Sequence, residues 1–224
     1  MISLAKLNSE KDRVVHNCKQ CGGLGCGTCF SYCSFIDKMA EAEIPVDYWF
    51  RSMGNFYGDE NFKKVVVEYI GKMSEHFANG LVYCFVGHRG TGKTLAACEI
   101  LKKAISNKYS IYYTTMVDAV GRLLTSESYQ FRKLIKQTDF FVIDEVDQRF
   151  FPSPGSQELY GNQFENIIRS RVQNRLPTIM CTNSEDTDQI FEGEFQQSFE
   201  SLKAQFIRVI RAGGKDARKG NEKL

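Results

Sequence analysis

Long apolar runs are missing from this sequence of 224 residues. No segment approaches the roughly 20 consecutive apolar residues that a membrane-spanning helix needs. The first residues, Met1–Leu7, also lack a sustained apolar stretch of signal-peptide length. These absences argue against a membrane protein and against a secreted precursor. We therefore expect a cytoplasmic protein with no membrane partner.

A strong charge of one sign is missing as well. Lysine and arginine number 29 against 27 aspartates and glutamates, which gives a formal net charge of +2. This balance provides no overall field that would attract nucleic acid or a membrane surface, so any nucleic-acid contact must be local. The basic residues form small separate clusters, most of which we interpret as solvent-exposed: Lys102–Lys103, Arg132–Lys133, Arg169–Arg171 and Arg218–Lys219.

Internal repeats and low-complexity tracts are also absent, and the 42% hydrophobic content indicates one main core with a small appendage. The first forty residues differ from the rest, because they are rich in cysteine and glycine and show no long hydrophobic period. After them, apolar residues recur at helical spacing between Phe62 and Phe77, and Asn79-Gly80 should end that helix. We predict a cysteine-rich metal-binding module at 1–40, a linker and amphipathic helix at 41–80, and a larger core at 81–224.

The core shows short apolar segments that alternate with longer amphipathic ones. This alternation is typical of an α/β fold in which helices connect the strands of a parallel sheet. Strands are expected at Val82–Val86, Ser110–Thr114, Phe140–Asp144, Thr178–Thr182 and Phe206–Ile210, and helices at Lys93–Ser106, Met116–Leu124, Tyr129–Lys136 and Gln163–Arg175. Only about a dozen residues follow the last expected strand, so we expect no large C-terminal lid.

A glycine-rich segment joins the first of these strands to the helix after it. Its sequence is Gly87-His88-Arg89-Gly90-Thr91-Gly92-Lys93-Thr94. Glycine-rich backbone that leads into a helix N-terminus offers amide donors and a positive dipole end to a polyphosphate. Lys93 can then reach the outer phosphates, and the Thr94 hydroxyl can ligate Mg²⁺. A plain turn would explain the glycines but not Lys93 and Thr94, so the segment predicts an ATP-binding phosphate loop.

Two further strand ends carry polar residues that suit the same site. The apolar strand 140–144 ends in Asp144-Glu145, about fifty residues after the loop. Asp144 would hold Mg²⁺ through water, and Glu145 would act as general base on the attacking water. Asn183 follows the strand 178–182 and would sense the γ-phosphate. A solvated acidic turn and an ordinary turn asparagine are the alternatives, and we disfavour both because of the loop upstream.

Five of the eight cysteines lie between Cys18 and Cys33. Four of them form two Cys-x₂-Cys pairs separated by four residues: Cys18, Cys21, Cys26 and Cys29. Four thiolates in a tetrahedral array suit Zn²⁺, and so short a segment needs a metal to fold because it cannot bury a core. The spacer is short for a zinc ribbon, so His16 or Cys33 could replace one ligand, and an iron–sulfur cluster is a second possibility.

The order of these motifs resembles a known family. The phosphate loop, the Ile143-Asp144-Glu145 strand end, a long helix, Arg175–Ile179 and Thr182-Asn183 are similar to the AAA+ ATPases of the DnaC/IstB type, the bacterial and phage helicase loaders and transposition helpers. The resemblance covers roughly residues 44–219. Gly214–Lys219 also resembles the closing Gly-x-Asp-x-Arg motif of that family, in which the arginine, here Arg218, would contact nucleotide.

This resemblance implies a DNA replication factor that binds and hydrolyses ATP with Mg²⁺. Such a helicase loader binds single-stranded DNA and delivers a hexameric replicative helicase onto it, in the cytoplasm of a bacterial or phage-infected cell. Self-association that depends on ATP is also implied. By analogy, the cysteine-rich module would dock on the helicase or contact DNA.

One departure from the family pattern leaves other functions open. The family usually has a Ser-Arg-Leu-like stretch whose arginine completes a neighbour's ATP site, and here the chain reads Ser198-Phe199-Glu200-Ser201-Leu202. Lys203, Arg208 and Arg175 are the remaining candidates for that role. A transposase-helper ATPase of the IstB type and a metal-stapled adaptor that binds ATP with little turnover are therefore alternatives. A small-molecule kinase is disfavoured, because Asp144-Glu145 suits water activation and no arginine-bearing lid is evident.

Overall fold

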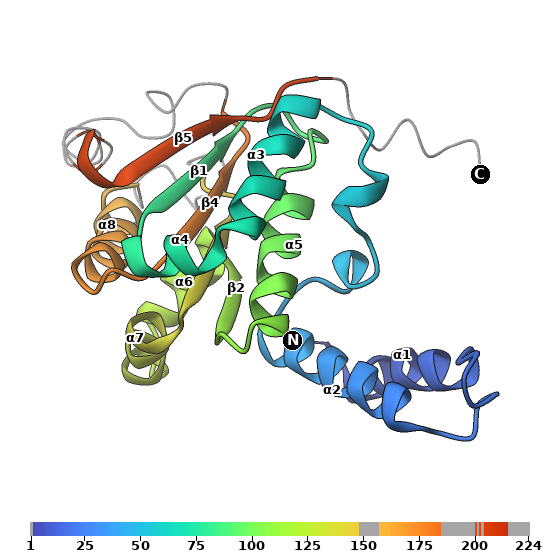
Figure 1. Cartoon of the computed structure of the whole chain (residues 1–224). Coiled ribbons are helices and arrows are strands. Elements are labelled where there is room, and N and C mark those ends of the chain that lie inside the picture. The colour runs from blue at the N-terminus through green and yellow to red at the C-terminus, as the bar shows by residue number, and fades with distance from the viewer. Residues whose placement is uncertain (1, 148–156, 185–199, 201, 203, 215–224) are drawn as a thin grey trace. The chain divides into compact units, whose positions relative to one another are not determined.

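The computed structural model describes residues 2–147, 157–184, 200, 202 and 204–214 (Figure 1). Its contacts divide the chain into two compact units, residues 1–51 and 52–224. The first unit contains α1 (Leu4–His16), α2 (Gly27–Glu41) and the 3₁₀ turn η1 (Val46–Tyr48). The second contains η2 (Met53–Asn55), α3 (Glu60–Gly71), α4 (Met73–Asn79), β1 (Val82–Val86), α5 (Lys93–Ser106), β2 (Ile111–Thr115), α6 (Met116–Leu123), α7 (Ser128–Gln137), β3 (Phe140–Asp144), α8 (Gln157–Gln173), β4 (Thr178–Thr182) and β5 (Ile207–Arg211).

The second unit is built on a five-stranded sheet in the order β2-β3-β4-β1-β5, and every pairing is parallel. Helix α5 connects β1 to β2, α6 and α7 connect β2 to β3, and α8 lies between β3 and β4, as parallel pairing requires. The predicted α/β fold with a parallel sheet between helices is therefore confirmed. In this sheet β1 lies between β4 and β5, and β3 lies between β2 and β4 (Figure 1).

Helices cover both faces of the sheet, and the strand residues alternate between them. Phe141 and Ile143 of β3 belong to the core formed with α6, α7 and α8. Asp144, one residue further on, points to the opposite face, where its carboxylate meets Thr94 of α5. In β2, Tyr112 likewise lies on the face toward α6–α8, and Tyr113 lies on the face of Asp144. The period of two along each strand thus decides which side chains reach α5 and which reach α6–α8.

The helix expected between Phe62 and Phe77 is interrupted. Lys72 has φ −106° and ψ 26°, which ends α3 and begins α4. Gly80 ends α4 in the left-handed conformation, with φ 62°, as the Asn79-Gly80 pair predicted. A Cβ atom on Gly80 would lie 2.2 Å from the backbone of Arg175, so this turn also needs glycine for close packing.

Arg171 of α8 contradicts our interpretation of the Arg169–Arg171 cluster as solvent-exposed, because its side chain is fully buried. Its Nε–H donates to the Thr178 hydroxyl at 2.7 Å. Its two terminal nitrogens donate to four backbone carbonyl oxygens, those of Ile135, Thr138, Asp139 and Pro177, at distances between 2.6 and 3.1 Å. All five guanidinium hydrogens therefore have acceptors, on the segments around α7, β3 and β4.

The first unit is a pair of packed helices with the cysteine-rich loop between them. Ser3 caps α1 by accepting a hydrogen bond from the Lys6 N–H. Glu10 is buried in α1 and forms ion pairs with Lys6 at 3.2 Å and with Arg13 at 3.0 Å. These two helices were not predicted from the sequence. Charged residues dominate α1, and α2 begins inside the cysteine-rich segment, so neither shows a simple apolar period.

The compact units differ from the predicted boundaries at 40 and 80, because residues 41–51 belong to the first unit and α3 and α4 belong to the second. The three cysteines that follow Cys33 in the sequence, Cys84, Cys98 and Cys181, are buried. Within the described residues, none of the helices has the length and apolar character needed to cross a bilayer.

Candidate nucleotide and metal sites

The carboxyl ends of β1, β3 and β4 meet at one edge of the sheet, where open α/β sheets bind their ligands. Two backbone hydrogen bonds fasten the segments that follow these strands. The Gly87 N–H donates to the Ser184 oxygen at 3.1 Å, and the Val146 N–H donates to the Cys181 oxygen at 2.9 Å. The phosphate loop, the carboxylates after β3 and the residues after β4 are therefore held beside one another.

The predicted phosphate loop is the turn between β1 and α5. Three of its glycines have positive φ: 143° at Gly87, 82° at Gly90 and 87° at Gly92. A Cβ atom at Gly87 would lie 2.2 Å from the Ala212 oxygen, just after β5, so a side chain does not fit there. Gly92 is the N-cap of α5 and has no side chain with which to cap it, which leaves the first-turn amides available to an anion.

Side chains within the loop hold its backbone in place. The Thr91 hydroxyl donates to the His88 oxygen at 2.9 Å. The buried Lys93 ammonium donates to the Gly87 oxygen at 2.7 Å and to the His88 oxygen at 2.6 Å. His88 and Arg89 are exposed at the tip of the turn. The loop thus presents a lysine charge and helix amides at one place, as binding of a polyphosphate requires.

Thr94 and Asp144, fifty residues apart, lie in contact. The Thr94 hydroxyl donates to Asp144 Oδ2 at 2.7 Å. The Glu145 N–H donates to Oδ1 of the same carboxylate at 2.8 Å. A threonine hydroxyl and a carboxylate at the end of the phosphate loop are hard oxygen ligands, so the residues present fit Mg²⁺.

A third donor to this carboxylate was not predicted. The Tyr113 hydroxyl, on β2, donates to Asp144 Oδ2 at 2.8 Å. Burial, together with the nearby Asp144 charge, raises the pKa of Tyr113 well above its ordinary value, so the hydroxyl keeps its proton at neutral pH. From the sequence, Tyr113 was assigned only to a core strand, because nothing in the local pattern shows which strand will pair with β3.

Glu145 follows β3 with φ 54°, in the left-handed region, and its side chain is exposed. Partial desolvation raises the pKa of Glu145, and the charges of Asp144 and Asp118 act in the same direction. Arg89 of the phosphate loop opposes this shift. A carboxylate that is more basic than usual and lies close enough to Arg89 of the phosphate loop to interact with its charge suits a general base.

The other predicted nucleotide contacts differ in what the structure shows of them. Asn183 directly follows β4 and precedes Ser184, whose oxygen accepts from the Gly87 N–H. Arg218 lies outside the described residues, as does Lys203. Arg208 is exposed on β5 beside Tyr83, and Arg175 is exposed just before β4, at the amino edge of the sheet and away from the phosphate loop.

Asp59 belongs to this region, although the sequence patterns did not single it out. Its Oδ1 caps α3 by accepting from the Asn61 N–H at 2.8 Å and the Phe62 N–H at 3.2 Å. Its Oδ2 accepts from the Gly213 N–H, after β5, at 2.9 Å. The Phe62 amide, followed by those of Gly213 and Asn61, lowers the pKa of Asp59. An aspartate just before an apolar helical period is a signal that could have identified the N-cap, but no local signal indicates the bond to Gly213.

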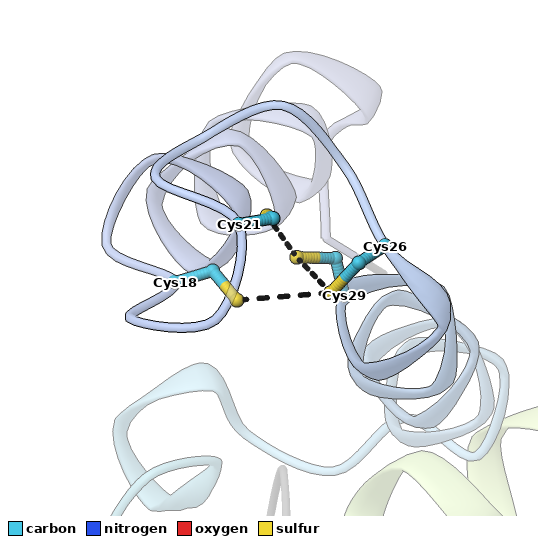
Figure 2. A group of neighbouring side chains, drawn as sticks. All are labelled: Cys18, Cys21, Cys26 and Cys29. Carbon is cyan, nitrogen blue, oxygen red and sulfur yellow. Dashed lines mark hydrogen bonds between the residues drawn. The ribbon is translucent and has the colours of Figure 1, made fainter.

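The four cysteines of the two Cys-x₂-Cys pairs converge in the first unit, and their sulfur atoms all lie within 4.8 Å of one another (Figure 2). The Sγ–Sγ distances are 3.5 Å for Cys21–Cys29, 3.7 Å for Cys26–Cys29 and 3.9 Å for Cys18–Cys26. Tetrahedral Zn–S bonds of about 2.3 Å place sulfur atoms roughly 3.8 Å apart. The four thiols therefore fit a single tetrahedral ion.

Neighbouring groups divide the protons among these thiols unevenly. The Cys29 N–H lowers the pKa of Cys26 to about 6. A backbone hydrogen bond at Cys26 lowers the pKa of Cys29, but side-chain hydrogen bonds with the other three cysteines, together with burial, outweigh it and raise this pKa to about 12. Metal binding would deprotonate all four. Within the described part of the chain, His16 and Cys33 are not members of this group. An iron–sulfur cluster places several atoms between its thiolates, so the short distances favour one ion over a cluster.

Strand β1, the glycine-rich turn, α5 and the Thr94–Asp144 pair together define a P-loop nucleotide-binding protein. Comparison with known families makes the class specific. The model of the ATPase family associated with various cellular activities (AAA) matches residues 83–202, which is more than half of the chain. The chain belongs to this AAA ATPase family.

Solved structures share the fold at low sequence identity. A DnaI crystal structure is 15% identical with a TM-score of 0.61, over 78% of this chain and 94% of that one. The DnaC helicase loader is 15% identical with a TM-score of 0.60, over 75% of this chain and all of the other. DnaA bound to AMPPCP and single-stranded DNA is 17% identical with a TM-score of 0.56, over 78% of this chain.

This chain spans about half of the DnaA chain, 52%. No curated protein matches the sequence. The likeness to DnaC and DnaI confirms, for the fold, the resemblance that the order of motifs indicated.

Proposed function

We propose that this protein is an ATP-dependent helicase loader, a DNA replication factor of the DnaC type. The observation that carries the proposal is the contact between Thr94 and Asp144 beside the phosphate loop, in an AAA chain. The fold likeness to DnaC and DnaI, which covers at least 94% of each of those chains, supports the choice of helicase loading among AAA functions.

In this proposal the amides of the loop and of the first turn of α5 bind the ATP phosphates, and Lys93 neutralises the outer ones. Thr94 and Asp144 hold Mg²⁺, which supplies charge stabilisation to the leaving and transferred phosphates. Glu145 orients and deprotonates the attacking water, since its pKa is raised above the ordinary glutamate value and it is therefore a stronger base than a typical carboxylate. Asn183 contacts the γ-phosphate, and Arg218 contacts the nucleotide.

The first unit would serve as a docking element for a hexameric replicative helicase. The four clustered cysteines would hold Zn²⁺ and fix the loop between α1 and α2. Single-stranded DNA is the second partner that we propose, and ATP-dependent self-association the third. All of these activities would take place in the cytoplasm.

The test combines the purified chain with the replicative helicase of its host, ATP, Mg²⁺ and single-stranded DNA. We expect a complex by size-exclusion chromatography and phosphate release that increases on adding DNA. Lys93→Ala should lose ATP binding, because Arg89, the other cation of the loop, is exposed at the tip of the turn and does not replace the buried ammonium. Unchanged ATP affinity would contradict the site assignment.

Other outcomes separate the remaining functions. A complex with a transposase but not with the helicase would favour the IstB-type alternative. ATP binding without phosphate release, with or without DNA, would favour the adaptor. Absence of ATP binding by the wild-type protein would overturn the proposal as a whole.

A further inference from the structure

The carboxylate of Asp144 is buried and receives three hydrogen bonds. Two donors belong to the motifs themselves: the Thr94 hydroxyl and the Glu145 N–H. The third, the Tyr113 hydroxyl at 2.8 Å from Oδ2, comes from a different strand and belongs to no nucleotide-binding motif recognised in the sequence. Tyr113 is itself buried, so its hydroxyl has been removed from water to make this bond.

The sheet explains why this tyrosine can reach the carboxylate. β2 pairs with β3 in parallel, with Tyr113 opposite Val142. Side chains at Val142 and Asp144 share the face toward α5, so the Tyr113 side chain on that face passes alongside Asp144. Tyr112 points to the other face, where its hydroxyl accepts a hydrogen bond from Arg122.

The three hydrogen bonds fix both oxygens of the carboxylate. The Thr94 hydroxyl has one hydrogen, which it gives to Asp144, and its oxygen lone pairs stay available to a metal. A carboxylate free to rotate about its Cβ–Cγ bond would not keep that hydrogen in place. Tyr113 shares the acceptor Oδ2 with Thr94, so it fixes the oxygen on which the orientation of the Thr94 hydroxyl depends.

We propose that Tyr113 is a positioning residue of the magnesium site, which acts through Asp144 and Thr94 and does not touch the metal itself. The inference rests on the proposed function, since it takes Mg²⁺·ATP as the ligand of this site. Removing a hydrogen-bond partner of a metal ligand typically weakens metal binding by about 10- to 100-fold. A purely structural role for Tyr113 would instead affect folding and leave the Mg²⁺ dependence unchanged.

The test is the substitution Tyr113→Phe, which removes only the hydroxyl. A fluorescent ATP analogue is titrated into the full chain at increasing Mg²⁺ and also in EDTA, and phosphate release is measured over the same Mg²⁺ series. We expect the Mg²⁺ concentration for half-maximal binding to rise by about tenfold, with binding in EDTA unchanged. The half-maximal Mg²⁺ concentration for phosphate release should rise in parallel.

Tyr112→Phe is the matched control, because it removes a buried tyrosine hydroxyl from the same strand on the opposite face. It should leave the Mg²⁺ dependence as in the wild type. Tyr113→Met removes the same donor with different packing, so an effect shared by both variants at position 113 belongs to the hydroxyl. In an Asp144→Asn background, Tyr113→Phe should add no further shift, since the carboxylate through which it acts is gone.

Measurements on the wild-type protein distinguish failure of the proposed magnesium site from failure of the positioning role of Tyr113. If it binds the analogue without any dependence on Mg²⁺, the proposed magnesium site itself fails. If its binding depends on Mg²⁺ and Tyr113→Phe follows the same curve, Tyr113 does not position the site and the inference is overturned.

Discussion

The guanidinium of Arg171 is buried among uncharged acceptors: four carbonyl oxygens and one hydroxyl. It also lies over the ring of Phe141, with 4.8 Å between Cζ and the ring centroid. Burial lowers the pKa of Arg171 to about 9, and nearby Asp139 opposes the shift. The group therefore stays charged at neutral pH, and protein carbonyls replace its water shell.

We predict that Arg171→Met destabilises the fold strongly. The substitution removes one hydrogen-bond donor from each of five acceptors, and loss of one buried polar partner already costs about 1–3 kcal/mol. The expected decrease in the free energy of unfolding is more than about 3 kcal/mol, measured by urea denaturation followed by circular dichroism. Arg169→Met is the control: this arginine pairs with Glu165 at the surface, and its loss should cost less than about 1 kcal/mol. Equal losses in the two variants would contradict the assignment.

Glu145→Gln tests the general base. Glutamine keeps the size of the side chain and removes its basicity, so we expect ATP binding to persist and phosphate release to fall to background. Turnover needs the deprotonated form of Glu145. In the wild type, its raised pKa should therefore give the acidic limb of the pH–rate profile an apparent pKa above the ordinary glutamate value of about 4.3. Turnover retained in Glu145→Gln would show that another group acts as the base.

At the scale of elements, Asp59 joins the start of α3 to the chain that leaves β5. Its carboxylate accepts hydrogen bonds from two backbone N–H groups of the helix and from the N–H of Gly213. Phe56, three residues earlier, lies against the phosphate loop, since a Cβ atom on Gly92 would come within 2.3 Å of its ring. The segment before α3 therefore packs against the phosphate loop and helps to hold it in place.

We predict that Asp59→Ala lowers the free energy of unfolding at pH 7 by about 1–2 kcal/mol, as loss of an N-cap does. The folded-state pKa of Asp59 is lowered, so its stabilising effect is complete above the unfolded-state pKa of about 3.9 and is lost as the pH falls through the lower, folded value. Thermal unfolding at pH 7 and pH 3 should show a larger difference between the two proteins at pH 7 than at pH 3. Asp59→Asn, which retains a capping oxygen, should lose less at pH 7.

The sequence predicted the bounds of the central strands of the sheet better than those of its edge strands. The bounds of β1, β3 and β4 agree with prediction, because each is a continuous apolar run that ends in a glycine, a carboxylate or a polar pair. The edge strands β2 and β5 each lie one residue later than predicted. At β2, the Ser110 N–H is taken by the Asp139 carboxylate at 2.8 Å, so the strand begins at Ile111.

Helix starts were harder to predict where the local signal was weak. α8 begins at Gln157, six residues before the predicted start, although Gly161 and Asn162 are poor helix formers. Within the candidate site, the loop and the two strand ends could be predicted because each is a local pattern. Tyr113, Asp59 and Arg171 could not, since their roles depend on pairs of segments that only the fold brings together.

At the scale of the whole molecule, the four clustered cysteines and the phosphate loop lie in different compact units. The loop that holds Cys18 and Cys21 has three glycines with positive φ: Gly22, Gly23 and Gly25. Such a loop has little apolar burial of its own, so its order should depend on the metal. The residues that we propose for the nucleotide site all belong to the other unit.

We predict that the purified protein contains one equivalent of Zn²⁺, measured by mass spectrometry of the metal, and that a strong chelator removes it. Removal should expose the segment around Cys18–Cys29 to limited proteolysis while ATP binding, tested after Mg²⁺ is restored, stays unchanged. Cys29→Ser should lose the metal, and Cys33→Ser should retain it. Loss of ATP binding together with the metal would contradict the independence of the two sites.

Gly87 has only a hydrogen atom where other residues carry a side chain, and two features of the structure require this. The turn that we propose binds phosphate begins there, and the oxygen of Ala212 lies only 2.2 Å from the position that a Cβ atom would take. In a library of random variants selected only for soluble expression, substitutions at this position should already be depleted. Substitutions of the exposed Glu145 by glutamine or asparagine should survive that selection and disappear only when turnover is required. The two selections would thus separate the positions that the phosphate loop needs for folding from those that it needs for ATP hydrolysis.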